Sequence, residues 1–190
     1  MTSTNTLPNY VGGSWHPSES AEHLGVTNPA TGEVLGRVPM TPPEEVEDAV
    51  KAAQDAFPEW RRVPVVDRVQ YLFDLKVLLE ENLEDLARTI TEECGKTYDE
   101  SVGELRRGIE NVETACGAPS LMQGTNNEDI ARGIDEHMIR QPVGVMAAVT
   151  PFNFPGMIPL WFLPYAVATG NCFLLKPSEK VPHTSQLLFE

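Results

Sequence analysis

The fold of this chain is decided by one stretch of its sequence, Val143-Gly144-Val145-Met146-Ala147-Ala148-Val149. A continuous apolar run of this length predicts a strand that is covered on both faces in a parallel sheet. Thr150 to Pro155 then predicts a turn, Met157 to Thr169 an apolar helix, and Asn171 to Lys176 a second buried strand. Strand, helix and strand with short connections form one βαβ unit, so the sequence predicts an α/β fold.

The residues before this unit predict hairpins and then four helices. Short β-like stretches separated by turn residues occupy Asn9 to Pro39. Thr41-Pro42-Pro43-Glu44 has the spacing of a capping box with proline at the first helical position, so a helix begins there. Further helices are predicted after Pro64, from Asn82 as N-cap to Gly95 as the residue beyond the last turn, and from Tyr98 to about Gln123.

The segment between these helices and the βαβ unit has a different pattern. Its apolar residues lack helical spacing, so Asp129 to Gln141 predicts an exposed strand or arm. At the other end, Val181 to Thr184 begins another helix, whose apolar stripe stops at Glu190. A doubly wound sheet needs several more strands to cover the first two, so we expect these residues to hold an incomplete architecture.

Composition narrows the range of functions. The chain has 28 Asp and Glu against 14 Lys and Arg, a net charge of −14, which disfavours nucleic acid as a partner. The acidic residues are spread along the whole chain, which suits either a host with high internal salt or an ordinary acidic cytosolic protein. Three cysteines without CxxC spacing suggest neither zinc nor disulfides. A polar start and the lack of a membrane-length apolar run predict a soluble, cytoplasmic protein without a membrane partner.

Asn153 is a candidate catalytic residue because it follows the first buried strand. Ligands of open α/β sheets bind at the carboxyl ends of the strands. A side-chain amide held there can donate a hydrogen bond to an oxyanion in a tetrahedral intermediate. The alternative is an asparagine that satisfies the backbone of its own turn.

Lys176 and Glu179 follow the second strand, at the same edge of the predicted sheet. Lys176 can donate to ribose hydroxyls or phosphate, and Glu179 can accept from ribose hydroxyls, which favours NAD over NADP. The alternative is a solvated pair of charges in a loop. No GxGxxG follows the strand, and Gly95-Lys96-Thr97 is not a phosphate loop, because Ile90 stands where that motif needs glycine.

Several motifs together resemble the aldehyde dehydrogenase superfamily over essentially the whole chain. They are Asn28-Pro-Ala-Thr-Gly-Glu33, Phe57-Pro-Glu-Trp60, Pro142-Val-Gly-Val145, Pro151-Phe-Asn-Phe-Pro155, Gly170-Asn171 and Lys176-Pro-Ser-Glu179. Narrower features resemble the CoA-acylating methylmalonate-semialdehyde dehydrogenases: Phe152, Ser120-Leu-Met-Gln-Gly124, Met157-Ile-Pro-Leu-Trp161 and Lys176-Pro-Ser-Glu-Lys-Val-Pro182.

The resemblance implies NAD as cofactor, CoA as co-substrate, and oxidation of malonate or methylmalonate semialdehyde to acetyl-CoA or propionyl-CoA. It implies Asn153 as the oxyanion-hole amide and Arg107 as the residue that binds the substrate carboxylate, through paired hydrogen bonds. The alternative for Arg107 is an exposed helix arginine beside Arg106. The residues implied to line the NAD site are Thr150, Phe152, Lys176, Glu179 and Lys180, and no metal is implied.

The resemblance also implies three parts and a missing nucleophile. Residues 1–128 would be the helical part of the NAD-binding domain, 129–142 an oligomerisation arm, and 143–190 the first βαβ unit of an incomplete Rossmann-like sheet. The family's catalytic cysteine would lie beyond residue 190, since Cys94, Cys116 and Cys172 do not match it, so the 190 residues alone are expected to be inactive. The alternatives are a hydrolytic aldehyde dehydrogenase, or a non-catalytic remnant or subunit. The expected partners are copies of the chain or a complementary carboxyl-terminal polypeptide.

Overall fold

The predicted βαβ unit is present in the computed structural model, which describes residues 6–190. Strands β7 (Val145–Val149) and β8 (Cys172–Lys176) are joined by helix α6 (Met157–Ala168). The two strands are parallel, with Val145 opposite Cys172 and Val149 opposite Lys176. This arrangement confirms the α/β fold class and places the ends of both strands at one edge.

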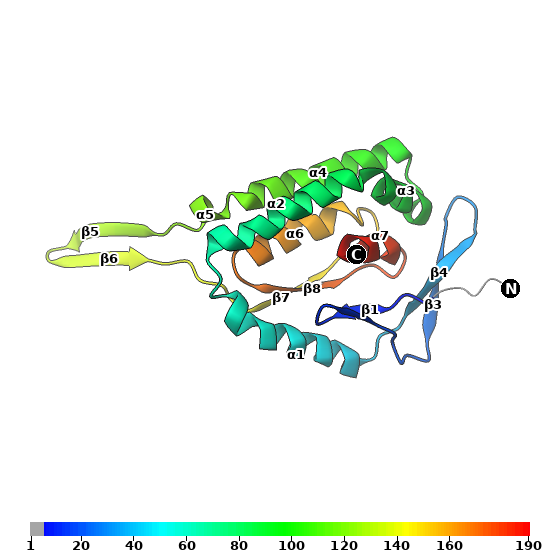
Figure 1. Cartoon of the computed structure of the whole chain (residues 1–190), viewed down its shortest axis with the longest axis horizontal. Coiled ribbons are helices and arrows are strands. Elements are labelled where there is room, and N and C mark those ends of the chain that lie inside the picture. The colour runs from blue at the N-terminus through cyan, green and yellow to red at the C-terminus, as the bar shows by residue number, and fades with distance from the viewer. Residues whose placement is uncertain (1–5) are drawn as a thin grey trace.

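Helices cover the two faces of this small sheet (Figure 1). Helix α1 (Pro43–Trp60) contacts both strands from one face, and α6 contacts them from the other. Beyond α6 lie α2 (Val65–Glu81), α3 (Leu83–Cys94) and α4 (Tyr98–Cys116). The main apolar core lies between these helices and α6, and includes Leu72, Ile90, Leu105, Val112 and Leu160.

Strand β7 is less buried than its apolar sequence predicts. Val149 is 79% exposed and Met146 is 41% exposed. Within residues 6–190, β7 pairs only with β8, so its other edge and part of its surface are open. Helices α1 and α6 contact β7 from its two faces, as predicted, but they leave several of its side chains exposed, so the burial of this strand is less complete than expected.

The start of β7 is held by an asparagine from the end of the βαβ crossover. The side-chain oxygen of Asn171 accepts hydrogen bonds from the backbone N–H groups of Val143 (2.7 Å) and Gly144 (2.9 Å). Its amide nitrogen donates to the hydroxyl of Thr169 at 2.9 Å. The Gly170-Asn171 motif thus has a structural role, since Asn171 aligns the entry of one strand with the entry of the other.

Two of the predicted helix caps lack the expected side-chain hydrogen bond. Helix α1 begins at Pro43 with Pro42 as its N-cap, and the hydroxyl of Thr41, the predicted N-cap, instead bonds to Asn9. The helix therefore starts one residue later than the capping-box spacing requires. Asn82 is the N-cap residue of α3, as predicted, but its side chain makes no cap hydrogen bond and instead donates back to the carbonyl of Leu78 at 2.9 Å.

Other helix ends follow the local rules more closely. Gly95 ends α3 in the left-handed conformation (φ 78°), as predicted. A complete capping box at Thr97 and Glu100 begins α4, and it was not among the caps predicted from the sequence. The long helix predicted from Tyr98 to about Gln123 is interrupted at Gly117, after which α5 (Ala118–Leu121) forms a short separate turn.

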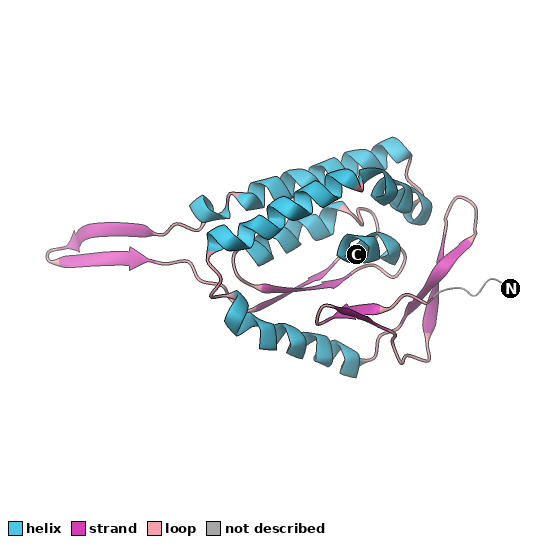
Figure 2. Cartoon of the chain, in the orientation of Figure 1, coloured by secondary structure: helices cyan, strands magenta, loops and turns pink. Residues whose placement is uncertain are grey.

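The remaining strands form three hairpins. The first two confirm the hairpins predicted before the helices: β1 (Asn9–Val11) with β2 (Ser14–His16), and β3 (His23–Thr27) with β4 (Val34–Pro39). The third, β5 (Thr125–Ala131) with β6 (Ile134–Met138), is an exposed arm that projects from the body (Figure 2). Helix α7 (Pro182–Phe189) follows β8.

The arm differs from the single strand that was predicted from Asp129. It is a two-stranded hairpin that begins at Thr125, and its polar start pairs across the strands, with the Asn126 side chain 2.8 Å from His137 Nδ1. These residues have no apolar period, so their strand conformation depends on the partner strand. In the described part of the chain, no helix combines the length and apolar character needed to cross a membrane.

Candidate functional site

The turns that follow β7 and β8 leave the sheet side by side. The backbone N–H of Thr150 donates to the carbonyl of Lys176 at 3.1 Å, which extends the strand pairing by one more bond. Thr150 is buried, whereas Lys176 is exposed. The structure therefore brings together two turns that the sequence places at one sheet edge.

The second turn carries an ion pair that faces solvent. Lys176 Nζ lies 3.2 Å from Glu179 Oε2, and both side chains are largely exposed. A hydrogen bond from its own backbone N–H, followed by the Lys176 ammonium, holds the pKa of the Glu179 carboxyl below its usual value. Lys180 Nζ lies 4.9 Å from the centre of the Phe152 ring, so it reaches across to the first turn. Thr150, Phe152, Lys176, Glu179 and Lys180 thus form one cluster.

Asn153 lies at the middle of the first turn and is exposed. Within the described residues its side chain has no hydrogen-bond partner, in contrast to Asn28, whose side-chain oxygen accepts from the N–H of Ala30 at 2.9 Å. The alternative in which Asn153 satisfies its own turn is therefore not realised. Its amide group remains available to a ligand at this edge.

A buried glutamate holds the far end of this turn. Glu104 on α4 accepts hydrogen bonds through Oε1 from the N–H groups of Gly156 (2.8 Å) and Met157 (3.1 Å). Its other oxygen pairs with Lys96, whose ammonium lies 3.9 Å from the centre of the Phe154 ring. Lys96, which follows the glycine that ends α3, therefore contacts the turn directly.

Cys94 contacts the same turn from α3. Its sulfur lies 3.4 Å from the carbonyl oxygen of Phe152. Burial raises the pKa of this thiol. The Lys96 ammonium acts in the opposite direction, and the Glu104 and Glu93 carboxylates raise the pKa further. Burial likewise raises the pKa values of Cys116 and Cys172. All three thiols therefore have the character of structural cysteines.

A second buried glutamate holds the far end of the other turn. Glu93 on α3 accepts from the N–H groups of His183 and Thr184, both at 2.8 Å, and also from the Thr184 hydroxyl. Sequence reasoning missed both Glu93 and Glu104. One signal was available, because Glu93 lies three residues after Ile90 and so falls on the apolar stripe of α3.

Arg107 lies on α4, one helical turn after Glu104, and is exposed. Its neighbour Arg106 pairs with Glu80, whereas the described residues provide no acidic partner for Arg107. An unpaired guanidinium can bind a carboxylate through two parallel hydrogen bonds. The geometry is compatible with the substrate role but equally with a solvated helix arginine, so that role stays a prediction.

Comparison with known proteins covers nearly the whole chain. The sequence pattern of the aldehyde dehydrogenase family matches residues 15–190. Malonate-semialdehyde dehydrogenase 2 of Geobacillus thermodenitrificans (strain NG80-2) is 52% identical over 190 residues, which are 100% of this chain and 39% of that protein. The chain thus spans about 39% of the length of the curated relatives that it matches first.

Solved structures agree with these sequence matches. The methylmalonate-semialdehyde dehydrogenase of Oceanimonas doudoroffii has a TM-score of 0.93 at 44% identity, covering 97% of this chain and 38% of that one. A structure from Sinorhizobium meliloti 1021, described as a methylmalonate-semialdehyde dehydrogenase complexed with NAD, has a TM-score of 0.94 at 38% identity. This match covers 99% of the present chain and 38% of the Sinorhizobium meliloti chain.

Proposed function

This chain belongs to the aldehyde dehydrogenase family, and from that premise we propose that it supplies part of the active site of an NAD-dependent, CoA-acylating malonate- or methylmalonate-semialdehyde dehydrogenase. The observation that carries the proposal is the pair of turns at the carboxyl edge of β7 and β8. One turn presents Asn153, and the other presents Lys176 and Glu179.

The residues at this edge fit the ribose of a nicotinamide cofactor. The side chains of Lys176 and Glu179 are 61% and 46% exposed, and the hydrogen bond between them leaves further donors and acceptors free. The Lys176 ammonium would donate to a ribose hydroxyl, and the Glu179 carboxylate would accept from one. Because a carboxylate repels a phosphate on the ribose, this pair favours NAD over NADP.

Asn153 and Arg107 would act on the aldehyde. The Asn153 amide would donate to the carbonyl oxygen as that oxygen gains negative charge, which lowers the barrier to attack by a thiolate. Arg107 would bind the carboxylate that distinguishes a semialdehyde from a simple aldehyde. NAD supplies the hydride acceptor for this chemistry, and CoA supplies the thiol that takes the acyl group.

A chimera tests this proposal directly. Residues 1–190 would replace the matching segment of the Geobacillus thermodenitrificans enzyme, which is 52% identical to them. NADH formation from malonate semialdehyde, dependent on CoA, is the expected result, and the isolated chain is assayed in parallel. A folded chimera that forms no NADH contradicts the proposal, and NADH formation without a need for CoA favours the hydrolytic alternative.

Two variants of the chimera test the residue roles. Asn153→Ala is expected to lower kcat by about 100- to 1000-fold, the usual effect of removing one oxyanion donor. Asn82→Ala is the matched control, because that side chain bonds only to the carbonyl of Leu78. Arg107→Ala should raise KM for malonate semialdehyde and leave KM for propanal unchanged. An equal change in KM for both aldehydes would show that Arg107 does not bind the substrate carboxylate.

A further inference from the structure

We propose that Glu93 and Glu104 are a pair of positioning residues, each of which holds one of the two site turns. Glu104 fixes the turn that carries Asn153, and Glu93 fixes the turn that carries Glu179 and Lys180. The functional half of this inference rests on the proposed function, because that function gives the two turns their roles.

Neither helix that follows a site turn has a cap of its own. The N-cap residues are Gly156 for α6 and Val181 for α7, and neither makes a side-chain cap hydrogen bond. The first N–H groups of a helix have no partner inside the helix and need an acceptor when they are buried. Glu104 supplies it for α6 from 52 residues away, and Glu93 supplies it for α7 from 91 residues away.

The choice of residue fits the task at both places. Glu93 and Glu104 are each only 3% exposed. A carboxylate accepts several hydrogen bonds and is favoured at the positive end of a helix dipole. Long glutamate side chains from α3 and α4 therefore reach helix starts that local serine or aspartate residues cap in other proteins.

Each turn is thereby held at both ends. The first is bonded to β8 at Thr150 and to Glu104 at Gly156, which leaves residues 151–155 between the two attachments. The second leaves β8 at Lys176 and reaches Glu93 at His183, which leaves residues 177–182. Asn153 lies in the middle of the first span, and Glu179 and Lys180 lie in the middle of the second.

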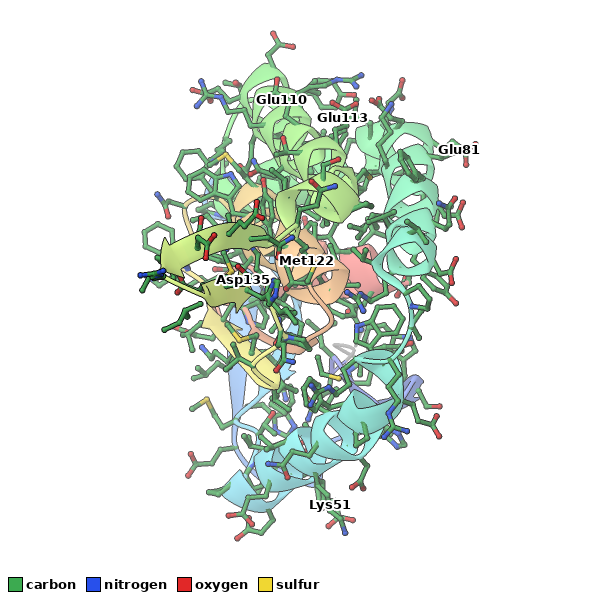
Figure 3. The ribbon with its side chains drawn as sticks, turned by 90° about the vertical axis from the view of Figure 1, so that its left-hand side faces the viewer. Lys51, Glu81, Glu110, Glu113, Met122 and Asp135 are labelled. Carbon is green, nitrogen blue, oxygen red and sulfur yellow. The ribbon has the colours of Figure 1, made fainter. Side chains whose placement is uncertain are left out.

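Glutamine substitution removes these attachments with little change in volume. In Glu104→Gln, the new NH₂ group faces either the Lys96 ammonium or the N–H groups of α6, so donors oppose donors. In Glu93→Gln, the NH₂ group faces an N–H of His183 or Thr184 in the same way. Glu92→Gln and Glu110→Gln are the matched controls, since both are exposed on the same helices, and Figure 3 shows Glu110 on the outer surface of the helical layer.

Amide hydrogen exchange and NMR spectra of the 190-residue chain test the pairing. Glu104→Gln should accelerate exchange at Gly156 and Met157 by about tenfold or more and leave His183 and Thr184 unchanged. Glu93→Gln should do the reverse, and the two controls should change neither pair. The Asn153 side-chain NH₂ resonances should broaden or split only in Glu104→Gln. The Glu179 and Lys180 amide resonances should do so only in Glu93→Gln.

A purely structural role would not produce this crossed pattern, in which each variant affects only the turn that its own glutamate contacts. Loss of general stability would accelerate exchange throughout the core in both variants, and that outcome overturns the proposal, as does a local change without any effect on the turn resonances. Titration with NAD separates this result from the proposed function. If NAD shifts no resonance of residues 176–180 in the wild-type chain, the cofactor role fails, while the crossed exchange pattern still decides whether the glutamates hold the turns.

Discussion

Gly108 allows α4 and α6 to approach each other, and its replacement by alanine is expected to destabilise the protein. A Cβ atom at this position would lie 2.7 Å from Cδ1 and 3.3 Å from Cβ of Leu160 on α6. Carbon atoms do not approach to 2.7 Å, so one helix would have to move. Leu160 is only 2% exposed and is surrounded by the core, which leaves its side chain little room to rotate away.

Two opposing effects decide the magnitude. An extra methyl group in a well-packed core costs about 1–3 kcal/mol. Alanine is favoured over glycine inside a helix by about 1 kcal/mol. The net expectation for Gly108→Ala is a loss of about 0–2 kcal/mol in the free energy of unfolding.

Gly103→Ala isolates the clash, because it makes the same change in the same helix. Gly103 is exposed, and a Cβ atom there would meet nothing within 4 Å. Only the propensity gain remains, so this variant should be more stable than wild type by about 0.5–1 kcal/mol. The two alanine variants should therefore differ by about 1–3 kcal/mol.

Urea unfolding followed by far-UV circular dichroism measures this difference. In a chain of this length, 1 kcal/mol corresponds to about 2–4 °C in Tm, so thermal scans should give the same order. Equal stability of the two variants would refute the reasoning, because it would mean that Leu160 yields at no cost. A lower stability of Gly103→Ala than of Gly108→Ala would refute it more strongly.

Three further outcomes are expected. Asn171→Ala removes the acceptor for the N–H groups of Val143 and Gly144 and should lower the free energy of unfolding by about 1–3 kcal/mol, measured in urea. Burial raises the pKa of the Cys94 thiol, so iodoacetamide at pH 8 should alkylate Cys94 more slowly than it alkylates glutathione, as measured by mass spectrometry. An equal rate would show that the thiol is open to solvent. The pKa of the Glu179 carboxyl is depressed, so this group should stay ionised and keep its contact with Lys176 as the pH falls. The contact should be lost only below the ordinary glutamate pKa of about 4.3. A ¹³C NMR titration of the Glu179 carboxyl carbon measures this pKa.

The sequence was most informative where a pattern depends on neighbours along the chain. Apolar runs predicted β7, α6 and β8, and glycine chemistry predicted the end of α3 at Gly95. Site residues could be proposed from the same patterns. Since the carboxyl ends of parallel strands share one edge, Asn153 and Lys176 were expected near each other, and their turns do leave the sheet at adjacent points.

Predictions failed where a residue had several possible partners. Thr41 and Asn82 have the right chemistry for helix caps, but Asn9 and Leu78 compete for the same side chains. The arm was predicted as one strand, because pairing between Asn126 and His137 cannot be read from either segment alone. The burial of β7 was overestimated, because exposure depends on which elements pack against a strand.

The sequence by itself therefore determined the βαβ unit, the helices, the acidic charge and the turns that carry Asn153 and Glu179. These features rest on periodicity and on hydrogen bonds between residues close in the chain. Only the tertiary structure decided that Glu104 and Glu93 hold those turns, that Lys96 contacts Phe154, and which faces stay open. A buried polar group must find a partner, but its identity depends on which helices pack together, and here those partners lie 52 and 91 residues apart.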